Sequence, residues 1–161
     1  MRRLDVGLSI LVGLPTVLLG VYGVKSFARL AETEQLCEVA SQGKNEMVKK
    51  YLDAGVDVNG RGWQSTTPLL RAVEGDQVDT AMLLLDRGAN IELANNRCTP
   101  LVWAVFGNNK KMVVALLERG ANPNAKKDER VSSLTIALQE HHPEIAEILR
   151  KAGATESLTD E

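Results

Sequence analysis

The chain has 161 residues, a length that fits one domain and an appendage. Its formal net charge is −2 at pH 7, and beyond residue 30 it holds 15 basic and 20 acidic residues. Because a nucleic-acid interface needs Lys and Arg to neutralise phosphates, this mildly acidic body argues against DNA or RNA as a partner.

The appendage is residues 1–29. Its residues 6–24 form a run of 19 without a charge, preceded by Arg2 and Arg3. As a helix, this run would span about 28 Å, close to the hydrocarbon thickness of a bilayer. We therefore predict one N-terminal transmembrane helix that acts as a signal anchor. The apolar positions of this predicted span include Val6, Leu11, Leu14, Leu18, Val21 and Val24.

Two other interpretations of the appendage stay open. A cleaved signal peptide would be cut near Ala28 and would give a secreted or periplasmic protein. A buried soluble helix would need apolar partners on every side. The basic residues before and after the run are nearly balanced, and they favour a cytoplasmic amino end only slightly. We therefore expect a single-pass membrane protein whose body lies on the periplasmic or extracytoplasmic side.

Residues 30–154 repeat one pattern four times. Leucines stand at positions 36, 69, 101 and 134, and a glycine follows each of them after 19 residues. Both series have spacings of 33, 32 and 33 residues, and a fixed period of this length predicts stacked supersecondary units. The predicted repeats are about 34–66, 67–98, 99–131 and 132–154, followed by a polar tail, 155–161.

The second repeat predicts how one unit folds. Thr67 is suited to cap a helix, and Pro68 suits the first helical turn. Gly75 should end this helix after about two turns, and Gly88 should end a second helix in the left-handed conformation. Helices this short cannot each bury an apolar stripe alone, so the repeats must stack. The stripe of the second helix is predicted to hold Val78, Ala81, Met82 and Leu85, with Leu84 beside it.

This pattern resembles the ankyrin repeat. The resemblance is carried by the Thr-Pro-Leu openings at 67–69 and 99–101, an Ala three residues on, a Leu-Leu pair and a closing Gly-Ala. It covers roughly residues 30–154. It implies an all-α solenoid of about four helix-turn-helix repeats with β-hairpin fingers, placed behind the predicted transmembrane helix.

The sequence departs from the family pattern in places. The histidine that the family usually places after the opening is Leu70 and Val102 here. The glycine after the first helix is Gly43 in the first repeat. We assign its counterparts, displaced by one residue, to Gly75 and Gly107 in the middle repeats, with His141 standing there in the last.

The sequence offers no pattern typical of catalysis or metal binding. It has no phosphate loop, no Cys-x-x-Cys pair and no nucleophile elbow. The two histidines, His141 and His142, are sequence neighbours, and neighbours on a helix do not face each other. We therefore expect no enzyme activity, no cofactor, no metal and no small-molecule substrate.

Aromatic residues are scarce, and their positions suggest a binding surface. Trp63 falls in the first finger. Trp103 and Phe106 lie three apart, off the stripe that points into the stack, on what the family makes the inner side of the first helix. Either they anchor a protein partner, or they thicken the packing between neighbouring helices, and Trp63 could instead pack on its own hairpin. The equivalent positions are Arg71 and Glu74, then Ile136 and Gln139. The predicted partner-binding residues are Trp63, Arg71, Glu74, Trp103, Phe106 and Gln139.

These patterns predict a membrane-tethered ankyrin-repeat module that binds another protein and is not an enzyme. Three other functions stay open, of which an enzyme ranks last for want of any convergent set of reactive side chains. The chain could be an exported inhibitor or immunity-type protein that neutralises a toxin or an enzyme. It could also be an accessory subunit of a membrane enzyme or transporter, in which the span itself is the binding element.

Overall fold

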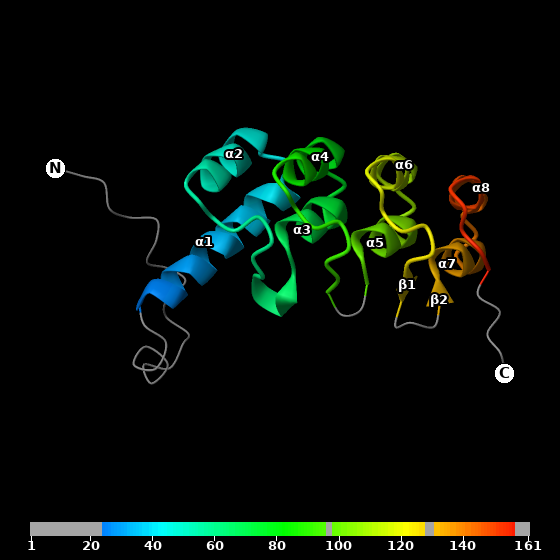
Figure 1. Cartoon of the computed structure of the whole chain (residues 1–161), viewed down its shortest axis with the longest axis horizontal. Coiled ribbons are helices and arrows are strands. Elements are labelled where there is room, and N and C mark those ends of the chain that lie inside the picture. Colours follow the sequence, from blue (N-terminus) through cyan, green and yellow to red (C-terminus); the bar gives the residue numbers. More distant parts are fainter. Residues whose placement is uncertain (1–23, 96–97, 128–130, 157–161) are drawn as a thin grey trace.

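The computed structural model describes residues 24–95, 98–127 and 131–156. These residues form eight α-helices in four consecutive pairs, with a 3₁₀ turn and one short β-hairpin (Figure 1). The helices are α1 (Val24–Ser41), α2 (Asn45–Asp53), α3 (Pro68–Glu74), α4 (Val78–Asp86), α5 (Pro100–Phe106), α6 (Lys110–Glu118), α7 (Ser133–Gln139) and α8 (Pro143–Lys151).

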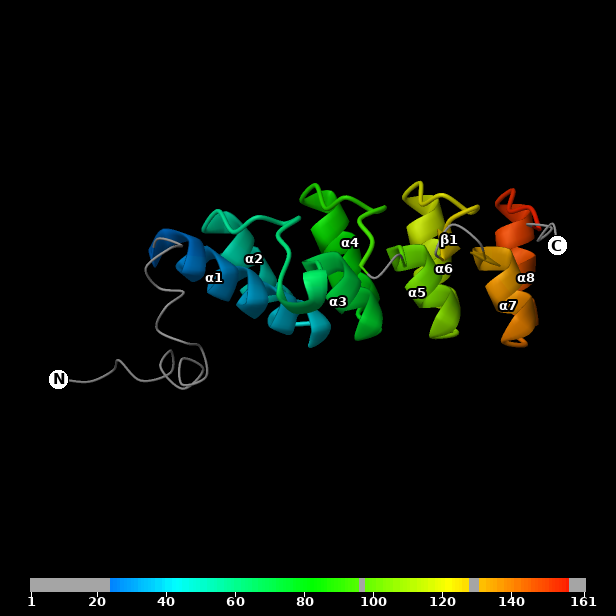
Figure 2. The same cartoon turned by 90° about the horizontal axis from the view of Figure 1, so that it is seen from below.

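The helix pairs stack in chain order. The first helices α1, α3, α5 and α7 form one row, and the second helices α2, α4, α6 and α8 form another (Figures 1 and 2). Each helix packs on its partner in the pair and on the helices of the same row in the neighbouring repeats. This is the contact pattern of a solenoid. The predicted helical repeat architecture is therefore confirmed for the described residues.

Side-chain caps start the first helices of three repeats. The hydroxyl oxygen of Thr67 accepts a hydrogen bond from the Leu70 N–H at 3.2 Å. Thr99 and Ser132 make the same contact one and two repeats along, at 3.4 Å and 3.2 Å. Each cap satisfies one of the N–H groups that have no partner inside the helix. The predicted cap at Thr67 is confirmed.

The turn between the two helices of each repeat contains one residue in the left-handed conformation. These residues are Gly43, Asp76, Asn108 and His141, with φ between 52° and 70°. Gly75 and Gly107 lie one residue before this position, as we assigned them; they are the C-caps of α3 and α5, with φ angles of −86° and −72°. Asp, Asn and His tolerate the left-handed region better than most residues, so the turn does not require glycine.

Gly75 is required for a different reason. A Cβ atom at this position would lie 2.2 Å from the backbone oxygen of Ser41, at the end of α1. At the equivalent Gly107, a Cβ would find the Trp103 carbonyl oxygen at 3.5 Å, which is ordinary contact. Gly75 therefore lets the first two repeats approach closely, and Gly107 has no such role.

The second helices turn a different side to the core than we expected. In α4 the buried residues are Thr80, Ala81 and Leu84. Val78, Met82 and Leu85 are half-buried and pack against the edge of this core. The buried side of α4 is therefore centred on other residues than the stripe that we predicted, although Ala81 belongs to both. The helix packs on α3 and on both neighbouring second helices, so its inward side is set by three partners together.

The three fingers between the repeats are not alike. The third contains a hairpin in which β1 (Lys126–Lys127) pairs antiparallel with β2 (Val131–Ser132). The second has a single bridge between Asn95 and Cys98. The first holds the 3₁₀ turn η3 (Trp63–Ser65) in place of a strand pair. Among the described residues, the prediction of β-hairpin fingers is therefore correct for the third finger only.

The first finger is hydrogen-bonded to α1. The backbone N–H of Trp63 donates to the Glu34 carboxylate at 2.8 Å. A Cβ at Gly62 would lie only 2.4 Å from the same carboxylate, so the glycine permits this approach. The N–H of Gly62 then closes the loop on the Thr66 carbonyl oxygen at 2.8 Å.

The first helix is longer than the other first helices. α1 has 18 residues and begins at Val24, so the boundary predicted at residues 29 and 30 falls inside it. The predicted membrane span lies outside the described residues except for Val24, and it stays a prediction. None of the described helices combines the length and the apolar character that a membrane span requires.

The two equivalent glycines give a matched test of the close approach. Gly75→Ala should lower the free energy of unfolding by about 1–3 kcal/mol or more, because the added methyl overlaps the Ser41 oxygen. Gly107→Ala should leave it unchanged or raise it by up to about 1 kcal/mol. Urea unfolding of the full-length protein, followed by circular dichroism, measures both. Equal effects of the two substitutions would contradict the packing described here.

Candidate functional site

The predicted partner-binding residues lie along the row of first helices and on the first finger. Trp63 belongs to η3, and the others come from α3, α5 and α7. Trp63 is 59% exposed, and Glu74 and Gln139 are also exposed. Arg71, Trp103 and Phe106 are half-buried. We call these six residues the inner face: Trp63, Arg71, Glu74, Trp103, Phe106 and Gln139.

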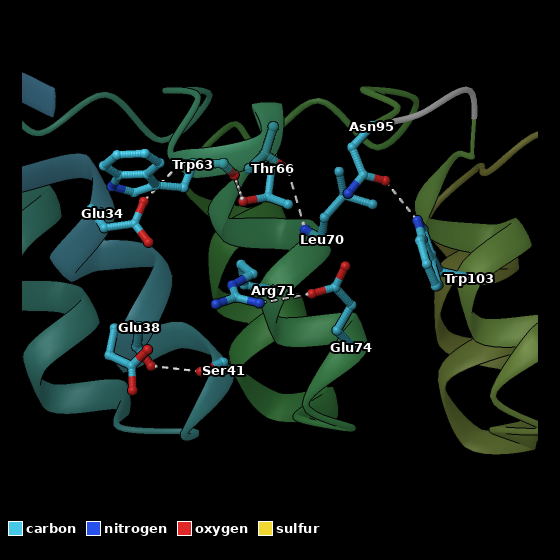
Figure 3. Close-up of polar contacts among 11 residues, drawn as sticks. Glu34, Glu38, Ser41, Trp63, Thr66, Leu70, Arg71, Glu74, Asn95 and Trp103 are labelled. Carbon is cyan, nitrogen blue, oxygen red and sulfur yellow. Dashed lines mark hydrogen bonds and ion pairs between the residues drawn. The ribbon is translucent and has the colours of Figure 1, made fainter.

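Trp63 projects from a finger that is held in place by α1. Its backbone is fixed by the hydrogen bond from its N–H to Glu34, while the side chain stays largely in solvent. Figure 3 shows the indole ring beside Glu34, at the edge of α1. The alternative in which Trp63 packs on its own hairpin is wrong, because the described residues of this finger form no hairpin.

Arg71 and Glu74 form an ion pair on α3, with 3.1 Å between Nη1 and Oε2 (Figure 3). This hydrogen bond to Glu74 is the main reason that the pKa of Arg71 is raised. Nε of Arg71 is buried without a hydrogen-bond partner among the described residues. The pair therefore fixes the guanidinium group but leaves part of its hydrogen-bonding capacity unused.

Cys37 lies in the core beneath this pair. Burial, together with the nearby charge of Glu34, raises the pKa of its thiol to about 12, while the charge of Arg71 acts in the opposite direction. A thiol with such a pKa is protonated at neutral pH and is a poor nucleophile. Cys37 is therefore a packing residue, in agreement with its complete burial.

Trp103 is held by a hydrogen bond to the second finger. Its indole N–H donates to Oδ1 of Asn95 at 2.7 Å, and Asn95 is only 4% exposed (Figure 3). The ring packs against the core and is still partly exposed. The two interpretations, packing and partner binding, are therefore compatible, and the binding role of Trp103 stays a prediction.

The ring of Phe106 contacts the ammonium group of a lysine. Nζ of Lys127, from β1 in the third finger, lies 5.0 Å from the ring centroid. This distance is typical of a cation–π interaction. Phe106 is also packed against the core. Its ring is therefore held by the helix stack below and by the finger above.

One residue of the expected row is not on the surface. Ile136, at the position equivalent to Arg71 and Trp103, is 2% exposed. This position therefore does not face outward in the last repeat. The aliphatic side chain joins the buried core, against which Trp103 and Phe106 also pack. Gln139, one turn further along α7, remains exposed.

A hollow of about 340 Å³ opens between α3 and α5. Its aromatic walls are Trp103 and Phe106. Buried Val73 and Ala104 also line it. Its charged residues are Glu74, at the end of α3, and Asp76, in the turn that follows. Aromatic and acidic groups thus meet in one concave part of the inner face.

The histidines have no metal-binding arrangement. Nδ1 of His142 lies 3.1 Å from the carbonyl oxygen of Val105, so this ring connects the last two repeats. His141 occupies the left-handed turn before α8. Within the part of the chain that the structure describes, no group of three His, Cys, Asp or Glu residues could hold a metal ion.

A family model described as ankyrin repeats (3 copies) matches residues 36–127, which are more than half of the chain. The chain belongs to the ankyrin-repeat family. Its fourth repeat lies beyond the matched residues, but its first helix has a side-chain N-cap like those of the middle repeats, and its left-handed turn and closing glycine recur in all the others. Among curated proteins, no sequence matches this ankyrin-repeat chain.

Family membership supports the general role of the inner face. Ankyrin repeats mediate protein–protein interaction, so the chain is a protein-binding module in this broad sense. Four residues of the site escaped the sequence-based prediction: Glu34, Asp76, Asn95 and Lys127. Asp76 could have been found, because the left-handed turn recurs with the same period as the leucines. Glu34, Asn95 and Lys127 act through contacts with residues of other elements, and the spacing of the repeats does not predict such contacts.

The bond between Trp103 and Asn95 can be tested with the two tryptophans of this protein. Trp103→Phe keeps a ring but removes the donor, which leaves the buried Asn95 oxygen without its partner. We expect a loss of about 1–3 kcal/mol in the free energy of unfolding. Trp63→Phe should change it by less than about 0.5 kcal/mol, because the ring is exposed. If urea unfolding gives equal values for both variants, the bond does not stabilise the fold.

Proposed function

We propose that this protein is a membrane-tethered ankyrin-repeat module that holds another protein against its inner face. Its mechanism is recognition, and no covalent bond is made or broken. The observation that carries the proposal is the exposed indole of Trp63 on a finger whose backbone is fixed. Trp is among the residues that dominate binding energies at protein interfaces, because it buries a large area at small entropic cost.

The inner face is organised before any partner arrives. The Trp63 backbone is bonded to Glu34, Trp103 to Asn95, and Arg71 to Glu74. Side chains that are already ordered lose less conformational entropy when a partner binds. This rigidity supports a recognition surface made of residues from several repeats, because the bonded groups keep their places relative to one another.

The proposed tether is supported by the apolar run at residues 6–24. Within the described residues, α1 carries the chain from Val24 to Ser41 inside the first repeat. At 1.5 Å per residue, α1 is about 27 Å long. A tether that passes directly into this helix would hold the inner face close to the bilayer. We place the repeats on the periplasmic or extracytoplasmic side, as the slight charge bias favours.

The partner-binding role is tested by affinity purification of the tagged full-length protein in mild detergent. Trp63→Ala should weaken the recovered interaction by about 30-fold, which corresponds to about 2 kcal/mol, while unfolding is unchanged. Met47→Ala is the matched control, because Met47 is a large apolar residue of α2, 38% exposed and outside the inner face. Mass spectrometry identifies and quantifies the partner. Equal recovery with wild type and Trp63→Ala would contradict the proposal.

The tether is tested separately. In membranes washed with alkaline carbonate, the full-length protein should stay in the pellet, and replacing Leu11, Leu14 and Leu18 by Asp should release it, because charges in a span are costly. Edman sequencing of the retained protein should find an intact amino end. A new amino end just beyond Ala28, with the body in the soluble fraction, would instead identify a cleaved signal peptide.

A further inference from the structure

The hollow between α3 and α5 has rigid aromatic walls. Trp103 and Phe106 are three residues apart on α5, so they lie on the same side of the helix. Asn95 fixes the indole of Trp103, and both rings pack against the core. The negative face of such rings attracts cations, and the attraction grows where water is partly excluded.

The charged residues that line the hollow are both acidic. Glu74 ends α3, and Asp76 occupies the left-handed turn after it. Figure 3 shows Glu74 and Trp103 on the facing sides of α3 and α5. Arg71 donates to one carboxylate oxygen of Glu74, and Asn109 donates to one oxygen of Asp76 at 2.8 Å. These bonds orient the carboxylates, and each group has a second oxygen that can accept a hydrogen bond.

Lys127 shows that one of these aromatic rings already holds an ammonium group. Its Nζ lies 5.0 Å from the centroid of the Phe106 ring. Lys127 does not line the hollow, so this contact leaves the space between Glu74, Asp76 and Trp103 open. The same combination of an aromatic face and a cation can therefore form inside the hollow with a group from another molecule.

We propose that this hollow receives an arginine or lysine side chain from a protein partner. The inference rests on the proposed function and adds the chemistry of the partner's anchoring residue. A cation in this space gains contacts with the Trp103 indole and with two carboxylates. An apolar side chain would cover the carboxylates without giving them hydrogen bonds, and an acidic one would be repelled by them.

The test uses the two tryptophan indole N–H signals in nitrogen-15 NMR spectra of the full-length protein in detergent. The probe is the peptide acetyl-Gly-Arg-Gly-amide, and its neutral counterpart carries citrulline in place of arginine. Titration with the arginine peptide should move the Trp103 signal in a saturable way, while the Trp63 signal stays fixed. The citrulline peptide should move neither. The Trp63→Phe variant assigns the two signals.

The variant Glu74→Gln with Asp76→Asn should bind the arginine peptide about fivefold or more weakly, because it removes both charges. Both substitutions keep an oxygen acceptor for Arg71 and Asn109. Asn also suits the left-handed turn, as Asn108 does in the next repeat. The control variant, Asp79→Asn with Glu118→Gln, makes the same charge change at exposed positions of the second helices and should bind like wild type.

Four results would overturn the inference. They are equal shifts with both peptides, no saturable shift at Trp103, unchanged binding by the Glu74 and Asp76 variant, and a Trp103 shift that follows protein concentration without peptide. The last would identify a second copy of the chain as the occupant. If the purified partner is lost with Trp63→Ala but kept with the charge variant, the proposed function stands and only the cationic anchor fails.

Discussion

Each repeat of this protein buries its apolar side chains only against its neighbours, and the rest of the structure depends on that constraint. In the middle repeats, the two helices of each pair are seven and nine residues long, and a helix of this length is too short to be stable alone. Leu69, Leu84, Leu101 and Leu116 are nearly or fully buried because α3 to α6 pack on one another in two rows. Each repeat must therefore keep the same turn between its two helices, since a repeat with a shifted helix would lose contacts with both of its neighbours.

The ends of the stack show how the constraint is relaxed. Leu138 is 40% exposed, whereas Val73 and Val105, at equivalent positions, are 3% and 0% exposed because a following repeat covers them. On the outer side of α8, Arg150 takes the position that Leu85 and Leu117 hold in the middle repeats, and it pairs with Glu156 at 3.0 Å. A charged outer side lets the last repeat face water. At the other end, the repeat stack begins with the long helix α1.

The helix stack depends little on the exposed side chains of the inner face. Backbone polar groups there are satisfied by the helices and their caps. Exposed side chains such as Trp63 and Glu74 therefore contribute little to stability. Those that do contribute, such as Trp103, hold their orientation through bonds to the fingers. The inner face is in this way built from one residue or two per repeat on a common scaffold.

The sequence alone determined the period, the helix pairs, the caps and the closing glycines. These features depend on backbone conformation and on contacts within a few residues, which the local sequence specifies. Thr67 caps α3 within one turn, and Gly88 ends the second helix through its own φ of 87°. The candidate site was located in the same way, because residues three apart on a helix share a side whatever their surroundings.

Only the tertiary structure decided which of these residues are fixed, exposed or buried. Asn95 binds Trp103, Lys127 covers Phe106, Ser41 requires a glycine at position 75, and Ile136 is drawn into the core. Each contact joins atoms from different elements, and most of them join different repeats. The first finger follows the same principle, since Glu34 of α1 binds its backbone across 29 residues of sequence. Such contacts depend on how the repeats are placed against each other, and a periodic pattern describes each repeat without that placement.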